Sequence, residues 1–345
     1  MLLKRLTEAS GLPGMENEVR DIIRDEVKDI VDEMWTDALG NLITYKKGKE
    51  AGPAIMLAAH MDEVGLMITY IKDNGLLSFK PLGGVDPRVL VSKKVLIGSD
   101  KVPGVIGSKP IHLQQPNERK KAIPLKNLYI DIGAKDDKEA KKLVEVGDGA
   151  VFDTEFAEMG DGYAKGKAFD DRIGCSVLIE MLKIDHDLPM YAVFTVQEEV
   201  GLRGASVAAH DLDVDLALVI EGTTASDVPD MKGHQYSTSV GEGPAISLMD
   251  RSVIADKRIV QGLVDTAKEN ELNYQFRRTN FGGTDAGRIH LTKEGIPASV
   301  ISVPCRYIHS PVSMMSMDDY NTLIKLVDKY LQKIEKGGFP DERID

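Results

Sequence analysis

The sequence has few cysteines, no excess of positive charge and no long apolar run. Only two of its 345 residues are cysteines, Cys175 and Cys305, so we expect a reducing interior and no disulfide framework. The net charge of −12 argues against nucleic acid or an anionic membrane as the main partner, because both repel an acidic protein. No stretch is long and apolar enough to span a membrane, and residues 1–6 lack the apolar segment of a secretion signal. We therefore expect a cytoplasmic protein that acts on a small molecule or a peptide.

An apolar run near the middle of the chain organises the remainder. Residues 191–196 are apolar and rich in β-branched side chains, and Glu198, Glu199 and Gly201 follow them. This pattern is typical of a buried parallel strand with charge at its C-terminal tip, where open α/β sheets bind their ligands. Similar runs alternate with amphipathic stretches, which predicts an α/β fold. The other expected strands are residues 54–59, 216–220 and 298–303, and the expected helices include residues 2–9, 16–31, 136–145, 257–270 and 318–334.

The pattern changes between residues 66 and 161. Short alternating segments follow one another there, separated by turn residues such as Asn74-Gly75. Closely spaced strands with turn chemistry predict a small barrel-like β domain rather than βαβ units. We therefore expect one discontinuous α/β domain, formed by residues 1–65 and 162–345, with an inserted β-rich domain at residues 66–161.

Ionisable side chains stand at the ends of the expected strands and at the starts of helices. The C-terminal ends of parallel strands lie along one edge of a sheet, so residues distant in sequence can meet in one cleft. Two imidazoles with several carboxylates suit a pair of divalent metals that share one carboxylate and a water of lowered pKa. Zinc and cobalt suit this ligand set, and manganese or magnesium stay open. The residues are His60, Asp62, Asp170, Asp171, Glu198, Glu199, Glu221 and His309.

Five short motifs contain these residues. The motifs are His60-Met61-Asp62-Glu63-Val64-Gly65, Ala168-Phe169-Asp170-Asp171-Arg172, Val196-Gln197-Glu198-Glu199-Val200-Gly201, Gly282-Gly283-Thr284-Asp285-Ala286 and Ile308-His309-Ser310-Pro311. In this order they resemble the motifs of the M42 metalloaminopeptidases, the tetrahedral (TET) aminopeptidases, some of which carry the label glutamyl aminopeptidase or endoglucanase. The resemblance covers essentially the whole chain, including the insertion.

The resemblance implies a metallo-exopeptidase sheet of the phosphorylase/hydrolase-like type, with helices on both faces. It also implies a role for each residue. His60, Asp170 and Glu221 would bind one metal, and Asp170, Glu199 and His309 the other. Glu198 would be the general base, and Asp62 would support His60 from behind. A non-proline cis peptide bond between Asp170 and Asp171 is implied as well.

One position departs from the family pattern. Many relatives carry Asp where this chain has Glu221, and the additional methylene changes the reach of the carboxylate. Thr284 and Asp285 would line the substrate cleft by similarity, whereas a simple tight turn is the alternative reading of that loop. The five remaining histidines are expected mostly at the surface: His112, His186, His210, His234 and His290.

The implied activity is removal of N-terminal residues from short peptides. The family also implies a homo-oligomer, a hollow tetrahedral dodecamer built from dimers that meet through the insertion. Three alternatives stay open: a metal-dependent deacylase or dipeptidase on the same site, a glycosidase, and a peptide-binding or assembly protein without activity. A glycosidase is disfavoured because its two carboxyls must flank the bond about 5–9.5 Å apart, whereas Glu198 and Glu199 are adjacent.

Overall fold

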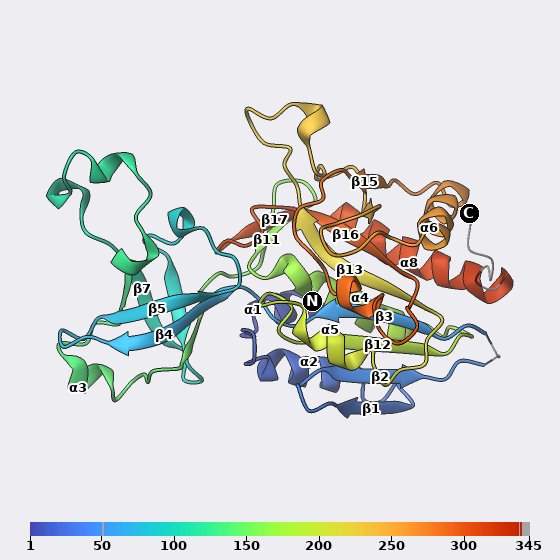
Figure 1. Ribbon diagram of the computed structural model, residues 1–345, viewed down its shortest axis with the longest axis horizontal. Coiled ribbons are helices and arrows are strands. Elements are labelled where there is room, and N and C mark those ends of the chain that lie inside the picture. The colour runs from blue at the N-terminus through green and yellow to red at the C-terminus, as the bar shows by residue number, and fades with distance from the viewer. Residues whose placement is uncertain (50–51, 338, 340–345) are drawn as a thin grey trace.

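The computed structural model describes residues 1–49, 52–337 and 339, which form two structural parts (Figure 1). The larger part is a sheet with helices on both faces, and the smaller part is a β-barrel. The helices are α1 (Leu2–Glu8), α2 (Asn17–Val27), α3 (Asp137–Ala140), α4 (Phe169–Lys183), α5 (Arg203–Ala208), α6 (Lys257–Glu269), α7 (Ala286–Ile289) and α8 (Met317–Gly337).

The large sheet has eleven strands within the described residues. Its central strands are β12 (Met190–Thr195), β3 (Ile55–His60), β13 (Leu216–Thr224) and β16 (Ala298–Arg306), which are parallel neighbours in that order. Antiparallel strands extend it on both sides: β1 (Glu33–Thr36) and β2 (Leu42–Lys46) beside β12, and β17 (Ser313–Ser316), β11 (Tyr163–Gly166) and β10 (Ala157–Met159) beside β16. The short strands β14 (Ala245–Ser247) and β15 (Gln275–Arg277) pair at the side of β16.

The central strands are apolar on both faces because helices cover both faces. All six residues of β3 are buried. One core cluster joins the odd residues of β3, such as Leu57, to α1, α2, α4, α6 and α8, and a second joins the even residues, such as Ala58, to α5 and α7. Burial on both faces leaves the strand ends as the place where ionisable groups can reach solvent.

Six strands within the described residues close the barrel, in the order β4-β5-β8-β7-β6-β9. They are β4 (Gly65–Ile71), β5 (Leu77–Leu82), β6 (Lys94–Ile97), β7 (Val102–Gly107), β8 (Tyr129–Asp131) and β9 (Gly149–Phe152). Its own apolar core includes Leu66, Ile106 and Ile130. The sequence-based prediction of an α/β fold with an inserted barrel is thus confirmed. The exact domain bounds stay a prediction, and β10, which falls in the predicted insertion, pairs with β11 of the large sheet.

Several predicted bounds were wrong. Helix α2 ends at Val27 and not at residue 31, and α3 covers only Asp137–Ala140 of the helix predicted at 136–145. Strand β13 continues beyond residue 220 to Thr224, because its pairing with β16 extends to Cys305. Glu221 therefore lies inside a strand rather than at its tip.

The structure also bears on the cysteines and on membrane-spanning helices. Cys175 and Cys305 both lie within the described residues, where they are buried and form no disulfide. Among the described helices none combines the length and apolar character needed to cross a membrane.

Candidate active site

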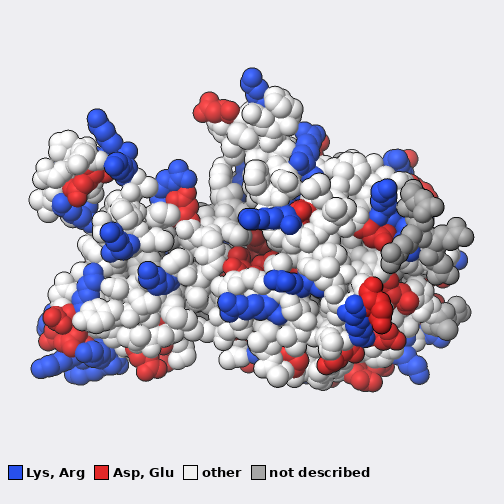
Figure 2. All heavy atoms as spheres, in the orientation of Figure 1, with Lys and Arg blue, Asp and Glu red and all other residues white. Residues whose placement is uncertain are grey.

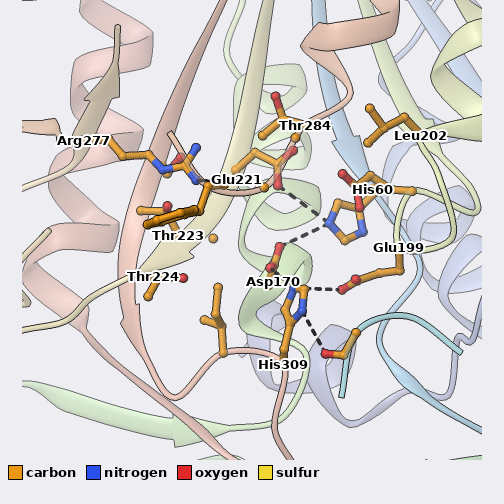
Figure 3. Close-up of a pocket in the computed structure, with 18 of the residues that line it drawn as sticks. His60, Asp170, Glu199, Leu202, Glu221, Thr223, Thr224, Arg277, Thr284 and His309 are labelled. Carbon is orange, nitrogen blue, oxygen red and sulfur yellow. Dashed lines mark hydrogen bonds and ion pairs between the residues drawn. The ribbon is translucent and has the colours of Figure 1, made fainter. Parts of the chain in front are cut away.

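Six of the seven residues to which the family resemblance gives a role line one cavity of about 610 Å³ at the C-terminal ends of the central strands. Figure 2 shows acidic side chains inside a hollow in the middle of the molecule, and Figure 3 shows how the cavity residues face one another. The seventh, Asp62, is completely buried beneath them. The six are His60, Asp170, Glu198, Glu199, Glu221 and His309.

These side chains come from several elements that meet at this edge of the sheet. His60 is the last residue of β3, and Glu198 and Glu199 follow β12. Asp170 lies at the start of α4, next to the cis peptide bond to Asp171 that the family resemblance implied. His309 lies in the loop between β16 and β17 with a left-handed backbone (φ 55°). Residues from motifs that are distant in sequence thus line one cavity.

Asp170 stands between the two imidazoles. Its Oδ1 lies 3.2 Å from His60 Nε2, and its Oδ2 lies 3.3 Å from His309 Nε2 (Figure 3). Each imidazole nitrogen has a second carboxylate close by, Glu221 at 3.7 Å for His60 and Glu199 at 3.6 Å for His309. The six residues therefore contain two sets of one imidazole and one carboxylate, joined by the two oxygens of Asp170.

The two imidazoles are oriented with Nε2 toward the cavity. His60 Nδ1 lies 3.0 Å from the backbone carbonyl of Asp62, and His309 Nδ1 lies 3.1 Å from that of Gly84. A carbonyl only accepts, so Nδ1 carries the proton and donates it in each hydrogen bond. The neutral ring then presents an unprotonated Nε2 to the cavity, which is the form that binds a metal ion.

The donor atoms fit metal ions. Ligand atoms bound at about 2.0–2.1 Å around one tetrahedral ion stand roughly 3.4 Å apart, close to the separations within each set. Glu199 Oε1 and Glu221 Oε1 are buried and have no hydrogen-bond donor within the described part of the chain. His60 with Asp171 and Glu221, and His60 with Asp170 and Glu199, are groups whose donor atoms are close enough to hold an ion.

Burial and charge crowding shift the pKa of nearly every group in the cavity. Burial raises the pKa of Glu199 to about 7 and that of Glu221 well above its usual value. Burial opposes protonation of His309, but the charges of Glu199 and Asp170 nevertheless raise its pKa to about 9. Several buried carboxylates near one another repel, and divalent cations relieve that repulsion.

Glu198 differs from the other carboxylates of the cavity. Burial raises its pKa well above the usual value, His60 opposes this, and Asp285 and Glu199 add to it. It belongs to neither set around Asp170. A carboxylate with a raised pKa at the edge of a metal-like site suits proton transfer rather than ligation.

Asp62 connects two of the site loops. Its Oδ1 accepts from the backbone N–H of Glu198 at 2.9 Å, and its Oδ2 from that of Glu199 at 3.0 Å. Its Oδ1 also lies 3.6 Å from His60 Nδ1. The carboxylate was expected behind His60, and it additionally fixes the loop that carries both glutamates.

Asp171 does not line the cavity, in contrast to Asp170. Its Oδ2 accepts from the backbone N–H of His60 at 3.2 Å and its Oδ1 from that of Gly174 at 2.9 Å. Both oxygens are thus used in holding the end of β3 against the start of α4. We therefore give Asp171 no ligand role, although its distance to His60 and Glu221 would permit one.

The loop at 282–286 is only partly as expected. Thr284 lines the cavity, but Asp285 is completely buried and accepts a hydrogen bond from the Thr195 hydroxyl. The surface prediction is wrong for His186, which is buried where α8 packs and lies 3.2 Å from Glu335. Sequence reasoning missed some residues that line the cavity, because they neither lie at ligand spacing nor carry an ionisable group at a predicted strand end. These residues are Leu202, Thr223, Thr224, Arg277 and Tyr307.

Comparison of the fold and the site with known proteins defines the class of this protein. It is an enzyme that hydrolyses peptide bonds. Residues 40–326 match the M42 glutamyl aminopeptidase family, and the chain belongs to this family. It is 32% identical to a lysyl aminopeptidase of Pyrococcus furiosus over 346 residues, which covers 98% of both chains.

Solved structures agree with this assignment. An aminopeptidase from the archaeon Desulfurococcus kamchatkensis superposes with a TM-score of 0.93 at 39% identity, covering 100% of this chain and 98% of the other. The TET1 peptidase of Pyrococcus horikoshii, described as assembling into a tetrahedron or a large octahedral shell, has a TM-score of 0.84 at 33% identity, covering 95% and 97%. The chain is therefore an M42-type aminopeptidase.

Proposed function

We propose that the protein uses two divalent metal ions to remove N-terminal residues from short peptides. The observation that supports this most is the position of Asp170, whose two oxygens each lie beside a different imidazole. A carboxylate in this position suits a bridge between two ions. His60 and Glu221 would complete one ion's ligands, and Glu199 and His309 the other's. Zinc or cobalt suits two imidazoles with carboxylates, and manganese or magnesium is the alternative.

The longer side chain at 221 is consistent with this ligand set. Glu221 lies inside β13, one residue before Gly222. A Cβ at Gly222 would lie only 3.0 Å from Asp170 Cα, closer than an ordinary contact, so the absence of a side chain there leaves room for Asp170. From this position Glu221 Oε2 lies 3.7 Å from His60 Nε2, so the additional methylene still allows it to act with His60.

Glu198 would act as the general base. Bound metals supply a water of lowered pKa and polarise the scissile carbonyl. The Glu198 carboxylate takes a proton from the attacking water and returns it to the leaving amine. Asp62 accepts hydrogen bonds from the backbone N–H groups of Glu198 and Glu199. It thereby fixes the orientation of the general base relative to the metal ligand.

We also propose a homo-oligomer. The Pyrococcus horikoshii relative assembles into closed shells, and the family assembly predicted for this chain is a tetrahedral dodecamer built from dimers. The inserted domain, residues 66–161, would supply the dimer contact. Light scattering of the purified protein tests this: a mass near twelve chains is expected, and a monomer at working concentration would refute it.

The activity is tested with short peptides offered with a free and with an acetylated N-terminus to metal-reconstituted protein. Release of one residue at a time from the free peptides alone is expected. Equal cleavage of both sets would indicate a deacylase or an endopeptidase instead. Absence of cleavage with zinc, cobalt, manganese and magnesium would favour a binding protein without activity.

A further inference from the structure

Arg172 is a completely buried cation that the proposed reaction does not use. It is the largest fully buried side chain in the described chain and lies on α4, two residues after Asp170. A buried charge costs several kcal/mol to desolvate, and apolar side chains of similar size often stabilise a fold equally well. Its presence beside the site therefore calls for a role other than stability alone.

The Arg172 guanidinium donates hydrogen bonds to two separate segments. In the N-terminal segment it reaches the backbone carbonyls of Leu6, Ala9 (3.1 Å) and Gly11 (3.3 Å). In the loop after β3 its Nε donates to the carbonyl of Met61 at 2.8 Å, and its Nη2 donates to the Glu63 carboxylate at 3.1 Å. One planar group thus joins residues 6–11 to residues 61–63.

Met61 is the residue between His60 and Asp62. Fixing its carbonyl fixes the peptide that connects the imidazole ligand to the carboxylate that holds Glu198 and Glu199. The N-terminal segment also meets this loop directly, since the Glu63 N–H donates to the carbonyl of Gly11 at 2.8 Å. The guanidinium, which does not line the cavity, therefore holds the loop together with the N-terminal segment.

At Gly11 the N-terminal segment packs closely against the Arg172 guanidinium. A Cβ at this position would lie 2.7 Å from both Arg172 Nη2 and Val19 Cγ2, and 3.3 Å from the carbonyl oxygen of Met61. The first distance is too short for any side chain, so only glycine lets the N-terminal segment approach the guanidinium. A methyl group here would press against both Arg172 and Val19, and it would leave the charge of Arg172 in place.

Lys167 provides a comparison within the same cluster. Its ammonium donates to the Glu63 carboxylate at 2.6 Å and to the carbonyl of Ala9 at 2.9 Å, and it is equally buried. It makes no hydrogen bond to the backbone of residues 60–62 within the described structure. Lys167 and Arg172 thus share burial and two partners, Ala9 and Glu63, whereas Arg172 also donates to the carbonyls of Leu6, Gly11 and Met61.

We propose that Arg172 is a positioning residue, which holds the His60–Asp62 loop through the carbonyl of Met61 and so sets the affinity and geometry of the metal site. This role rests on the proposed metal binding at that site. It makes residues 6–11, which contain none of the ligands, part of the support of the active centre.

The test measures metal affinity by chelator competition and the visible absorption of the cobalt-loaded protein, with the melting temperature of the metal-free form in parallel. Arg172→Lys keeps the charge but loses the fork of donors, and we expect the metal dissociation constant to rise about 10- to 100-fold, as for other groups that orient ligands. The cobalt spectrum should change. Lys167→Met is the matched control and should stay within about threefold of wild type.

Gly11→Ala gives a second, independent variant in case Arg172→Lys does not fold. It should weaken metal binding in the same direction with all charges in place. Wild-type affinity and spectrum in Arg172→Lys or Gly11→Ala would overturn the proposal, as would an equal loss in Lys167→Met. If the wild-type protein itself binds no metal, the proposed function falls, and this inference falls with it.

Discussion

The large sheet and the barrel differ in how their strands are buried. Strand β3 of the sheet is buried at every position and ends in His60, whereas β7 of the barrel alternates between exposed and buried residues. A strand covered on both faces can present ionisable groups only at its end, and parallel neighbours bring such ends together. An antiparallel barrel spreads its polar side chains over its outer surface instead (Figure 2). All seven proposed site residues accordingly lie outside the barrel.

The barrel residue that lines the main cavity is Gly84, in the loop after β5. The loop after β5 brings the carbonyl of Gly84 to His309 Nδ1 and places Gly83 beside Glu199. The sheet thus supplies the chemical groups, and the barrel supplies one wall that orients them.

The largest effect on activity should come from a substitution at the end of a strand of the large sheet. In Glu198→Gln we expect turnover to fall by about 10²- to 10⁴-fold, the usual contribution of a general base, because the amide cannot accept the proton. Metal content should stay at the wild-type value, measured by elemental analysis on the same sample. A variant that retains near-normal turnover would contradict the assigned role.

A smaller effect should come from the barrel wall. Gly83 has φ +79°, and a Cβ there would lie 2.8 Å from Val64 and 3.3 Å from the Glu199 side chain. We expect Gly83→Ala to cost about 1 kcal/mol or more in stability, because the left-handed backbone disfavours alanine, and to weaken metal binding.

Gly84→Ala is its matched control. The added Cβ would lie 3.5 Å from His309 Nδ1, an ordinary contact, so stability and metal affinity should be nearly unchanged. Chemical denaturation and chelator competition measure both quantities. Equal effects in the two variants would mean that the barrel loop does not hold Glu199 in the way described.

The smallest effect concerns the pH dependence of stability. Burial lowers the pKa of Lys167 from 10.5 to about 8 in the folded protein. Between these values the unfolded chain binds more protons, so the free energy of unfolding should gain a positive contribution from Lys167 as pH rises from about 8 to 10.5. The slope can approach about 1.4 kcal/mol per pH unit.

Urea unfolding at several pH values measures this slope, which Lys167→Met should remove. The barrel offers an exposed counterpart in Lys94, whose pKa is raised by hydrogen bonding to Asp153, so that its contribution has the opposite sign and is small. Lys94→Met should therefore keep the wild-type slope. A slope unchanged in Lys167→Met would show that this lysine is not charged differently in the two states.

Much of the fold could be predicted because the apolar strands and the turn-rich insertion follow simple periodicities. The candidate residues could be named because ionisable groups that follow apolar strands are unusual. The position of Glu221 was misjudged, since nothing in residues 221–224 marks where pairing with β16 stops. Tertiary contacts with segments distant in sequence likewise determine the positions of Arg172, Gly84 and Arg277. No local sequence pattern indicates such contacts.

The measurement that tests the central claim most directly is the number of metal ions bound per chain in wild type and in Glu199→Ala. We predict two ions per wild-type chain, because Asp170 faces both imidazoles, and one retained ion in the variant, because His60, Asp170 and Glu221 are untouched. One ion in wild type, or full occupancy in Glu199→Ala, would contradict the account.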